Sequence, residues 1–200
     1  LCGVDSAYAG KTFKAHPNAA TYVDYRVMLE KQKDIDAVVI ATPDHTHAVI
    51  TMAAIEMGKH VYCQKPLTHT VEEARKITAA ARASKVQTQM GNQGHSSDAI
   101  RVVREWVQSG SIGDVKEVHA WTDRPDDGPW YANFGARDLP SDFPAVPDSL
   151  NWDLWLGPTQ DRKFSPAYHP FKWRAWLDFG TGALGDMGCH ILDPACWALD

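Results

Sequence analysis

Short apolar runs and amphipathic segments alternate along the first half of the chain. Residues 37–41 form an uninterrupted apolar run, which predicts a parallel strand covered by helices on both faces. Apolar positions recur at helical spacing over residues 47–57, which predicts a helix capped by Asp44 or Thr46 and ended by Gly58. The same kind of pattern predicts helices over residues 6–14, 71–84 and 98–108, and strands over residues 21–23, 61–64 and 86–90.

A strand, a crossover helix and a second strand predict an α/β fold with a Rossmann-type, doubly wound parallel sheet. Residues 1–5 read as the end of a strand, and the chain contains no Gly-x-Gly-x-x-Gly turn. We therefore expect residues 1–112 to be a partial dinucleotide-binding domain that lacks the glycine-rich turn. Residues 113–200 are expected to begin an α+β domain with a mainly antiparallel sheet, starting with a strand over residues 115–121. Because the chain stops within a helical pattern, we interpret it as a fragment that also lacks its C-terminal part.

The stretch from residue 123 to residue 150 is rich in Pro, Asp and Gly, which predicts irregular structure. A long irregular segment inside a compact domain is either functional or disordered. The aromatic residues Trp130, Tyr131 and Phe134 favour an ordered loop.

The composition favours a small-molecule ligand. Lys and Arg number 20 and Asp and Glu 25, and the net charge of −5 without a block of like charge favours neither nucleic-acid nor membrane binding. The four cysteines form no Cys-x-x-Cys pair, so we expect reduced, buried thiols. A cytoplasmic location is favoured, while an export signal upstream of the fragment stays open.

Three side chains form a candidate acid/base group. Lys65 follows the strand over residues 61–64, at the edge of the sheet where such folds bind ligands. Asp186 and His190 are four residues apart in a helix expected to begin near Gly182, so both project from one face. A histidine that titrates near neutrality can remove the hydroxyl proton of an alcohol as hydride leaves carbon. From spacing alone, an Asp-x-x-x-His pair is more often an ordinary surface arrangement.

Two sets of side chains have the chemistry of metal ligands, but we expect no metal site. The first set flanks a helix start, and the second lacks a cysteine or further histidine at useful spacing. These sets are Asp44, His45 and His47, and Asp186, His190 and Asp193.

Four motifs occur together in an order and spacing that resemble a known family. They are Ala41-Thr42-Pro43 with His47, the segment 58–66 ending in Gln64-Lys65-Pro66, the pair Trp173-Arg174, and the segment 182–190. In these motifs the chain resembles the Gfo/Idh/MocA oxidoreductases, such as glucose-fructose oxidoreductase and inositol dehydrogenase. The resemblance implies that Lys65 and His190 share proton transfer, and that Asp186 binds a substrate hydroxyl and orients the pair.

The resemblance also implies a nicotinamide cofactor, NAD or NADP. The family usually has Glu-Lys-Pro, and Gln64 in the glutamate position can still bond a ribose hydroxyl but carries no charge. Gly3 stands where an acidic residue normally binds the adenosine ribose, and NAD is slightly favoured because no arginine follows it. His47 can alternatively be a core histidine beside a plain turn. The expected cofactor-binding residues are Gly3, Asp5, Thr42, Pro43, His47, Gln64, Lys65, Gln93, Trp173 and Arg174.

The implied substrate is a carbohydrate, and the implied reaction is hydride transfer at a secondary alcohol of a sugar or polyol. Aromatic residues are dense after residue 150, and aromatic faces can bind sugar rings, so Tyr168 and His169 are expected on the substrate side. The alternatives are glycoside cleavage through transient oxidation and a dinucleotide-binding regulator without catalysis. A homo-oligomer formed through the sheet of the second domain is expected in the full-length protein.

Overall fold

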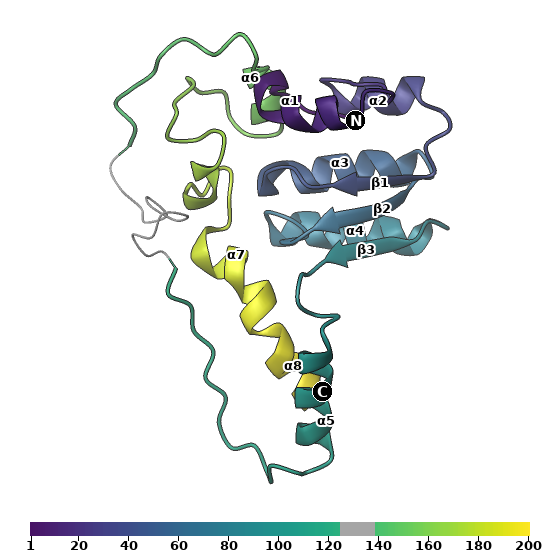
Figure 1. The fold of residues 1–200 in the computed structure, drawn as a ribbon, viewed down its shortest axis with the longest axis vertical. Coiled ribbons are helices and arrows are strands. Elements are labelled where there is room, and N and C mark those ends of the chain that lie inside the picture. Colours follow the sequence, from purple (N-terminus) through teal and green to yellow (C-terminus); the bar gives the residue numbers. More distant parts are fainter. Residues whose placement is uncertain (125–138) are drawn as a thin grey trace.

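The computed structural model describes residues 1–124 and 139–200, and these residues form an α/β fold (Figure 1). Its parallel strands lie in the order β1–β2–β3, as the strand–helix–strand pattern predicts. The strands are β1 (Ala37–Ile40), β2 (His60–Gln64) and β3 (Thr88–Gly91). The helices are α1 (Ser6–Ala15), α2 (Tyr25–Lys31), α3 (Asp44–Glu56), α4 (Val71–Ala83), α5 (Asp98–Gln108), α6 (Trp152–Leu156), the 3-10 helix η1 (Lys172–Ala175), α7 (Gly182–Ile191) and α8 (Asp193–Leu199).

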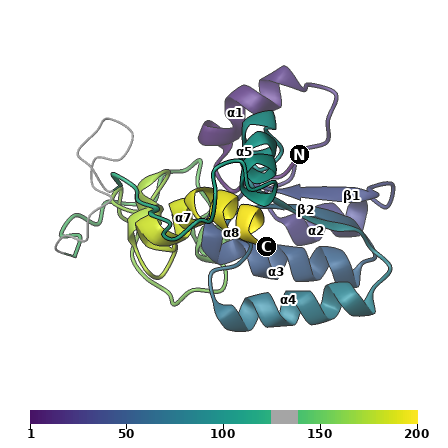
Figure 2. The ribbon, with the colours of Figure 1, turned by 90° about the horizontal axis from the view of Figure 1, so that it is seen from below.

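Helices α3 and α4 cover one face of the sheet (Figure 2). Val38 and Ile40 of β1 and Val61 and Cys63 of β2 are buried beneath them and form the first core. The expectation that helices cover both faces of β1 is wrong for the opposite face, where Val39 is 71% exposed. Side chains alternate along a strand, so burial alternates wherever the described helices cover only one face.

The helix boundaries follow local signals in most places. Thr70 and Glu73 form the capping box predicted for α4, and Gly58 ends α3 with a φ of 72°. Helix α3 begins at Asp44, three residues earlier than expected, and the side-chain cap expected from Asp44 or Thr46 is wrong because none is formed. Helix α2 was not predicted, although Asp24 caps it. Within the described ranges, no helix has both the length and the hydropathy needed to cross a membrane.

The strand expected over residues 115–121 is wrong. These residues form no regular structure and are mostly exposed. A strand needs a neighbour for its main-chain hydrogen bonds, and the described residues supply none at this position. The strand expected over residues 21–23 is reduced to one parallel bridge between Cys2 and Tyr22. From residue 139 onward the described chain contains helices and loops but no strand, and the loop expected around Trp130, Tyr131 and Phe134 lies outside the described residues.

A second, aromatic core lies beside the carboxyl ends of the strands. Trp155 and Phe179 are buried at its centre with ring centroids 4.7 Å apart. This core is joined to the start of the chain, because the main-chain nitrogen of Asn151 donates to the carbonyl of Val4 and Leu150 forms an antiparallel bridge with Asp5. The second core therefore packs next to the sheet edge where ligands bind in such folds.

Candidate active site

A cleft of about 560 Å³ runs along the carboxyl ends of the strands. The sheet side contributes Gly3, Thr42 and Lys65, which belong to three separate segments of the chain. The opposite wall comes from the region of η1 and from α7. Of the residues expected from the sequence, the cleft is lined by Gly3, Asp5, Thr42, Pro43, His47, Gln64, Lys65, His169, Trp173, Arg174 and Asp186.

Lys65 and Asp186 meet inside this cleft, although they are far apart in the sequence. Lys65 Nζ donates to Asp186 Oδ1 at 2.6 Å and to the main-chain carbonyl oxygen of Asp186 at 2.8 Å. Their side chains are only 16% and 10% exposed, so the ion pair is screened less than a surface pair. The ammonium group is thus fixed at the end of β2, where a substrate oxygen can approach it.

Arg124 is the second cation on Asp186, and the sequence analysis missed it. Arg124 Nη1 donates to Asp186 Oδ2 at 2.6 Å, so each carboxylate oxygen has a cationic partner. Burial acts to raise the pKa of Asp186, but hydrogen bonds and charge from Lys65 and Arg124 outweigh it and hold the pKa below the usual value. Asp186 therefore stays ionised in the cleft at neutral pH.

His190 lies one turn beyond Asp186 on α7 and is oriented by the loop after β3. Its Nδ1 lies 2.9 Å from the main-chain carbonyl oxygen of Gln93. The side chain of Gln93 in turn donates to Gln64 Oε1 at 2.5 Å. His190 and Gln93 do not line the cleft itself, and in the described part of the chain His190 is bonded to the loop after β3, whereas Lys65 is bonded to Asp186 one turn earlier on α7.

Histidines of the sheet domain bind a main-chain carbonyl of α6 and two carbonyls just before α7. His45 Nε2 lies 2.8 Å from the carbonyl oxygen of Trp155, and its Nδ1 lies 3.2 Å from that of Phe179. His69 Nε2 lies 3.2 Å from the carbonyl oxygen of Gly180. A Cβ at Gly180 would lie 2.6 Å from the backbone of Arg174, so only glycine permits this close approach. These contacts fix α7, and with it Asp186, against the end of the sheet.

Burial shifts the pKa of two side chains at the start of α3, His45 and Asp44. Burial lowers the pKa of His45 to about 4, although its two carbonyl neighbours act in the other direction. Burial raises the pKa of Asp44, and the charge of His47 and the hydrogen bond from Thr181 Oγ1 oppose that change. From the sequence, His45 was weighed as a metal ligand, and Asp44 as a metal ligand or a helix cap. The structure instead gives Asp44 a partner in Thr181, which precedes α7, and gives His45 the carbonyls of Trp155 in α6 and of Phe179.

His47 is a buried histidine with main-chain partners on both sides. Nδ1 lies 2.7 Å from the carbonyl oxygen of Pro66 and Nε2 lies 2.8 Å from that of Thr42. The ring therefore ties the turn after β1 to the turn after β2. His47 lines the cleft, as expected for a cofactor contact. Both of its ring nitrogens already have carbonyl partners, so neither is free to bond a cofactor.

Asp5 and His169 form a partly buried pair, and both residues line the cleft. Asp5 caps α1 through Oδ1, which accepts from the main-chain nitrogens of Ala7 and Tyr8. Its Oδ2 lies 2.8 Å from Nε2 of His169. The hydrogen bonds from His169 and the helix amides outweigh burial, which acts to raise the pKa of Asp5, and the pKa is lowered. The carboxylate of Asp5 is thus already engaged by the protein.

The aromatic residues divide between core and cleft. Tyr168 is buried in the aromatic core and does not line the cleft, so the structure places it away from the expected substrate side. Arg174 lines the cleft, and its guanidinium lies 4.1 Å from the ring centroid of Phe171 and 4.2 Å from that of Trp173. Such cation–π contacts fix the guanidinium plane in the cleft wall.

The donor chemistry of the cleft suits a dinucleotide better than a metal ion. Thr42, Gln64 and Arg174 supply hydroxyl, amide and guanidinium groups to one continuous cleft, which matches the ribose and phosphate groups of such a ligand. Among residues 1–124 and 139–200, no three His, Cys, Asp or Glu side chains converge as metal ligands. All four cysteines are free thiols, but the expected burial is wrong for Cys2 and Cys196, which are exposed, and only Cys63 is fully buried.

Comparisons with known proteins agree with this arrangement. A family model described as "Oxidoreductase family, NAD-binding Rossmann fold" matches residues 4–92, and one described as "Oxidoreductase family, C-terminal alpha/beta domain" matches residues 97–200. Levoglucosan dehydrogenase of Pseudarthrobacter phenanthrenivorans is 28% identical over 173 residues, which are 86% of this chain and 35% of that protein. Inositol 2-dehydrogenase 1 of Saccharopolyspora erythraea is 37% identical over 87 residues, covering 42% of this chain and 26% of that protein.

A solved structure extends the likeness to nearly the whole chain. The oxidoreductase domain protein from Kribbella flavida has a TM-score of 0.67 and 31% sequence identity, and the match covers 99% of this chain and 44% of that one. Levoglucosan dehydrogenase in complex with NADH and L-sorbose has a TM-score of 0.64 at 22% identity, which shows the shared fold. The chain spans about a third of the length of the first curated relative.

Proposed function

We propose that the chain, which belongs to the Gfo/Idh/MocA family of NAD-binding oxidoreductases, transfers a hydride at a secondary alcohol of a sugar or polyol. The observation that carries this proposal is the Lys65–Asp186 pair, 2.6 Å apart inside the cleft at the end of β2. Relatives with dehydrogenase names that refer to levoglucosan and inositol support the carbohydrate class.

The side chains of the cleft would manage the proton of the reacting hydroxyl. Lys65 would hold the substrate oxygen, and the ionised Asp186 would keep the ammonium group aimed at it. Lys65 and His190 would share the proton transfer, and His190 would accept the proton on Nε2, since Nδ1 faces the carbonyl of Gln93. A bound nicotinamide supplies the hydride acceptor.

Cofactor binding would use the sheet side of the cleft. Thr42 and Gln64 would contact ribose hydroxyls, and Arg174 and Trp173 would border the ligand from the opposite wall. Gly3 would leave the adenosine end without a ribose-binding carboxylate. NAD is favoured over NADP by the absence of an arginine after Gly3.

The test is turnover by the intact protein with NAD and with NADP. Levoglucosan, myo-inositol and 1,5-anhydro-D-fructose serve as probes, and reduction or oxidation of the nicotinamide is followed by absorbance. Net cofactor turnover with at least one probe is the expected result. Cleavage of a glycoside without net cofactor turnover would favour transient oxidation, and dinucleotide binding without either reaction would favour a regulator.

A further inference from the structure

The carboxylate of Asp186 is shared between two cations from different parts of the chain. Lys65 reaches Oδ1 from the end of β2, and Arg124 reaches Oδ2 from the segment that follows α5, each at 2.6 Å. The Arg124 side chain is 21% exposed and that of Asp186 is 10% exposed. The two contacts together prevent rotation of the carboxylate, because each oxygen is held by a separate charged donor.

We propose that Arg124 is a positioning residue that fixes the Asp186 carboxylate and helps Lys65 give up its proton, an inference that rests on the function proposed above. With Arg124 removed, the full charge of Asp186 would act on Lys65 and favour its ammonium form. With Arg124 present, the positive charge of Arg124 offsets part of the negative charge of Asp186 that acts on Lys65. Lys65 can then exchange a proton with the substrate oxygen more readily.

Other ionisable groups around this pair lie on α3 and α7, and Arg174 of η1 lines the same cleft. Asp44 of α3 lies close enough to Lys65 for its charge to influence the pKa of Asp44. Cys189 of α7 has a pKa raised by burial, while the charge of Lys65 acts to lower it. His47 of α3 and His190 of α7 have main-chain carbonyl partners. A substitution of Arg124 leaves these groups in place, so a change in the titration of Lys65 would report on Arg124.

The experiment measures the pH dependence of Lys65 acetylation by acetic anhydride in the intact protein, with mass spectrometry as the readout. Only the neutral amine reacts, so the midpoint of the curve reports its proton affinity without any substrate. Arg124→Met is expected to raise the midpoint by about one pH unit. Arg124→Lys keeps the charge and is expected to leave it near the wild-type value. Arg26→Met is the matched control, because Arg26 forms an exposed ion pair with Asp24, 2.8 Å long, and does not line this cleft.

Kinetics with a polyol that the wild type oxidises separate orientation from charge. Arg124→Lys is expected to lower kcat several-fold while its pH profile stays in place, since lysine lacks the guanidinium geometry. Arg124→Met is expected to lower kcat about tenfold or more. The alkaline side of its pH profile of kcat is expected to move to higher pH. Circular dichroism confirms that each variant is folded.

Unchanged acetylation midpoints in both folded Arg124 variants would overturn the role of Arg124, even if the wild type oxidises a polyol. A raised midpoint in Arg124→Met together with no oxidation of any probe by the wild type would support the influence of Arg124 on Lys65. In that case the absence of oxidation would contradict the proposed function, while the raised midpoint would still support the role of Arg124.

Discussion

The main-chain carbonyl oxygen of Gln93 lies 2.9 Å from Nδ1 of His190. A carbonyl oxygen only accepts, so the hydrogen of a neutral His190 is on Nδ1 and the lone pair is on Nε2. Two further contacts hold the same loop against α7 and α8. Asn92 Nδ2 donates to the carbonyl of Cys189 at 2.8 Å, and His95 Nδ1 lies 2.8 Å from Asp193 Oδ2. The loop after β3 therefore sets which nitrogen of His190 is available as a base.

Replacement of His190 by asparagine tests this assignment. The asparagine amide nitrogen can still donate to Gln93, but no basic nitrogen remains, so kcat is expected to fall by about 100-fold or more. Dinucleotide binding, measured by calorimetry, is expected to change little. His16→Asn is the control, because His16 is exposed on the C-terminal side of α1. A kcat within about tenfold of the wild-type value would remove His190 from proton transfer.

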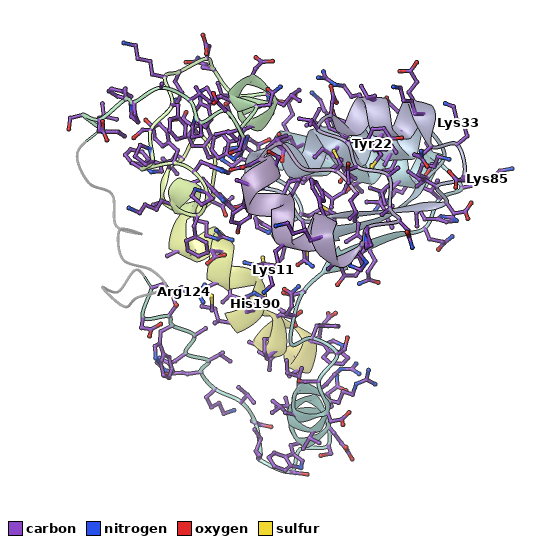
Figure 3. The ribbon with its side chains drawn as sticks, turned by 45° about the horizontal axis from the view of Figure 1, so that its top comes forward. Lys11, Tyr22, Lys33, Lys85, Arg124 and His190 are labelled. Carbon is purple, nitrogen blue, oxygen red and sulfur yellow. The ribbon has the colours of Figure 1, made fainter. Side chains whose placement is uncertain are left out.

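Lys65→Met is expected to abolish turnover while cofactor binding falls only modestly. Methionine retains much of the side-chain volume but provides no donor for the substrate oxygen or for Asp186. Single-turnover absorbance of the nicotinamide measures the chemical step, and a loss greater than about 100-fold is expected. Lys85→Met is the matched control, since Lys85 lies at the opposite edge of the molecule (Figure 3). A chemical step that survives in Lys65→Met would exclude the lysine from catalysis.

Several elements of the sheet domain were predictable because their signals are local, although α2 was not predicted. The apolar run before Ala41, the capping box at Thr70 and the glycine at position 58 each act within a few residues. The segment over residues 115–121 has a strand-like sequence, yet strand formation depends on a neighbouring strand that no local pattern reveals. Tyr168, expected on the substrate side, is buried in the aromatic core, and the sequence does not separate these roles because an aromatic side chain suits a core and a sugar site equally well.

The site was predictable in part. Lys65 and Asp186 could be chosen because one follows a strand and the other shares a helix face with His190. Arg124 could not be chosen, since its contact with Asp186 joins positions 62 residues apart and depends on the path of an irregular segment. His45 likewise finds its carbonyl partners more than one hundred residues away.

His45 makes the stability of the protein depend on pH. Its pKa is about 4 in the folded state against an ordinary 6.5, so the unfolded chain binds the proton more tightly. The contribution of neutral His45 to the free energy of unfolding is fully present above pH 6.5. It is lost as the pH falls toward 4, which lowers the free energy of unfolding by up to about 3 kcal/mol. Urea unfolding of the intact protein at a series of pH values measures this slope.

His45→Gln is expected to remove that part of the slope, because glutamine does not titrate but can still donate to the carbonyl of Trp155. His16→Gln, at an exposed position, serves as the control and should keep the wild-type slope. An identical pH dependence in His45→Gln and the wild type would show that another group is responsible.

Gly3 lies at the end of the cleft where a ribose-binding carboxylate would be expected. Asp5 is an unsuitable substitute, since its two carboxylate oxygens already bind the amides of α1 and the ring of His169. A Cβ at position 3 would lie 3.3 Å from Cβ of Ala9 and 3.7 Å from Cζ of Phe13. A side chain there requires a small shift of α1.

Gly3→Asp is expected to move the ratio of kcat/KM for NAD over NADP toward NAD by roughly one to two orders of magnitude. An ionised carboxylate accepts from a ribose 2'-hydroxyl and repels a 2'-phosphate, so it acts on the two cofactors in opposite directions. Gly3→Ala is the control, because it adds the same Cβ beside Ala9 without the charge and should leave the ratio unchanged. The wild type is expected to accept both dinucleotides with weak discrimination, because Gly3 neither binds the hydroxyl nor repels the phosphate. Strong rejection of NADP by the wild type, with no change in Gly3→Asp, would mean that a residue other than the one at position 3 distinguishes the cofactors.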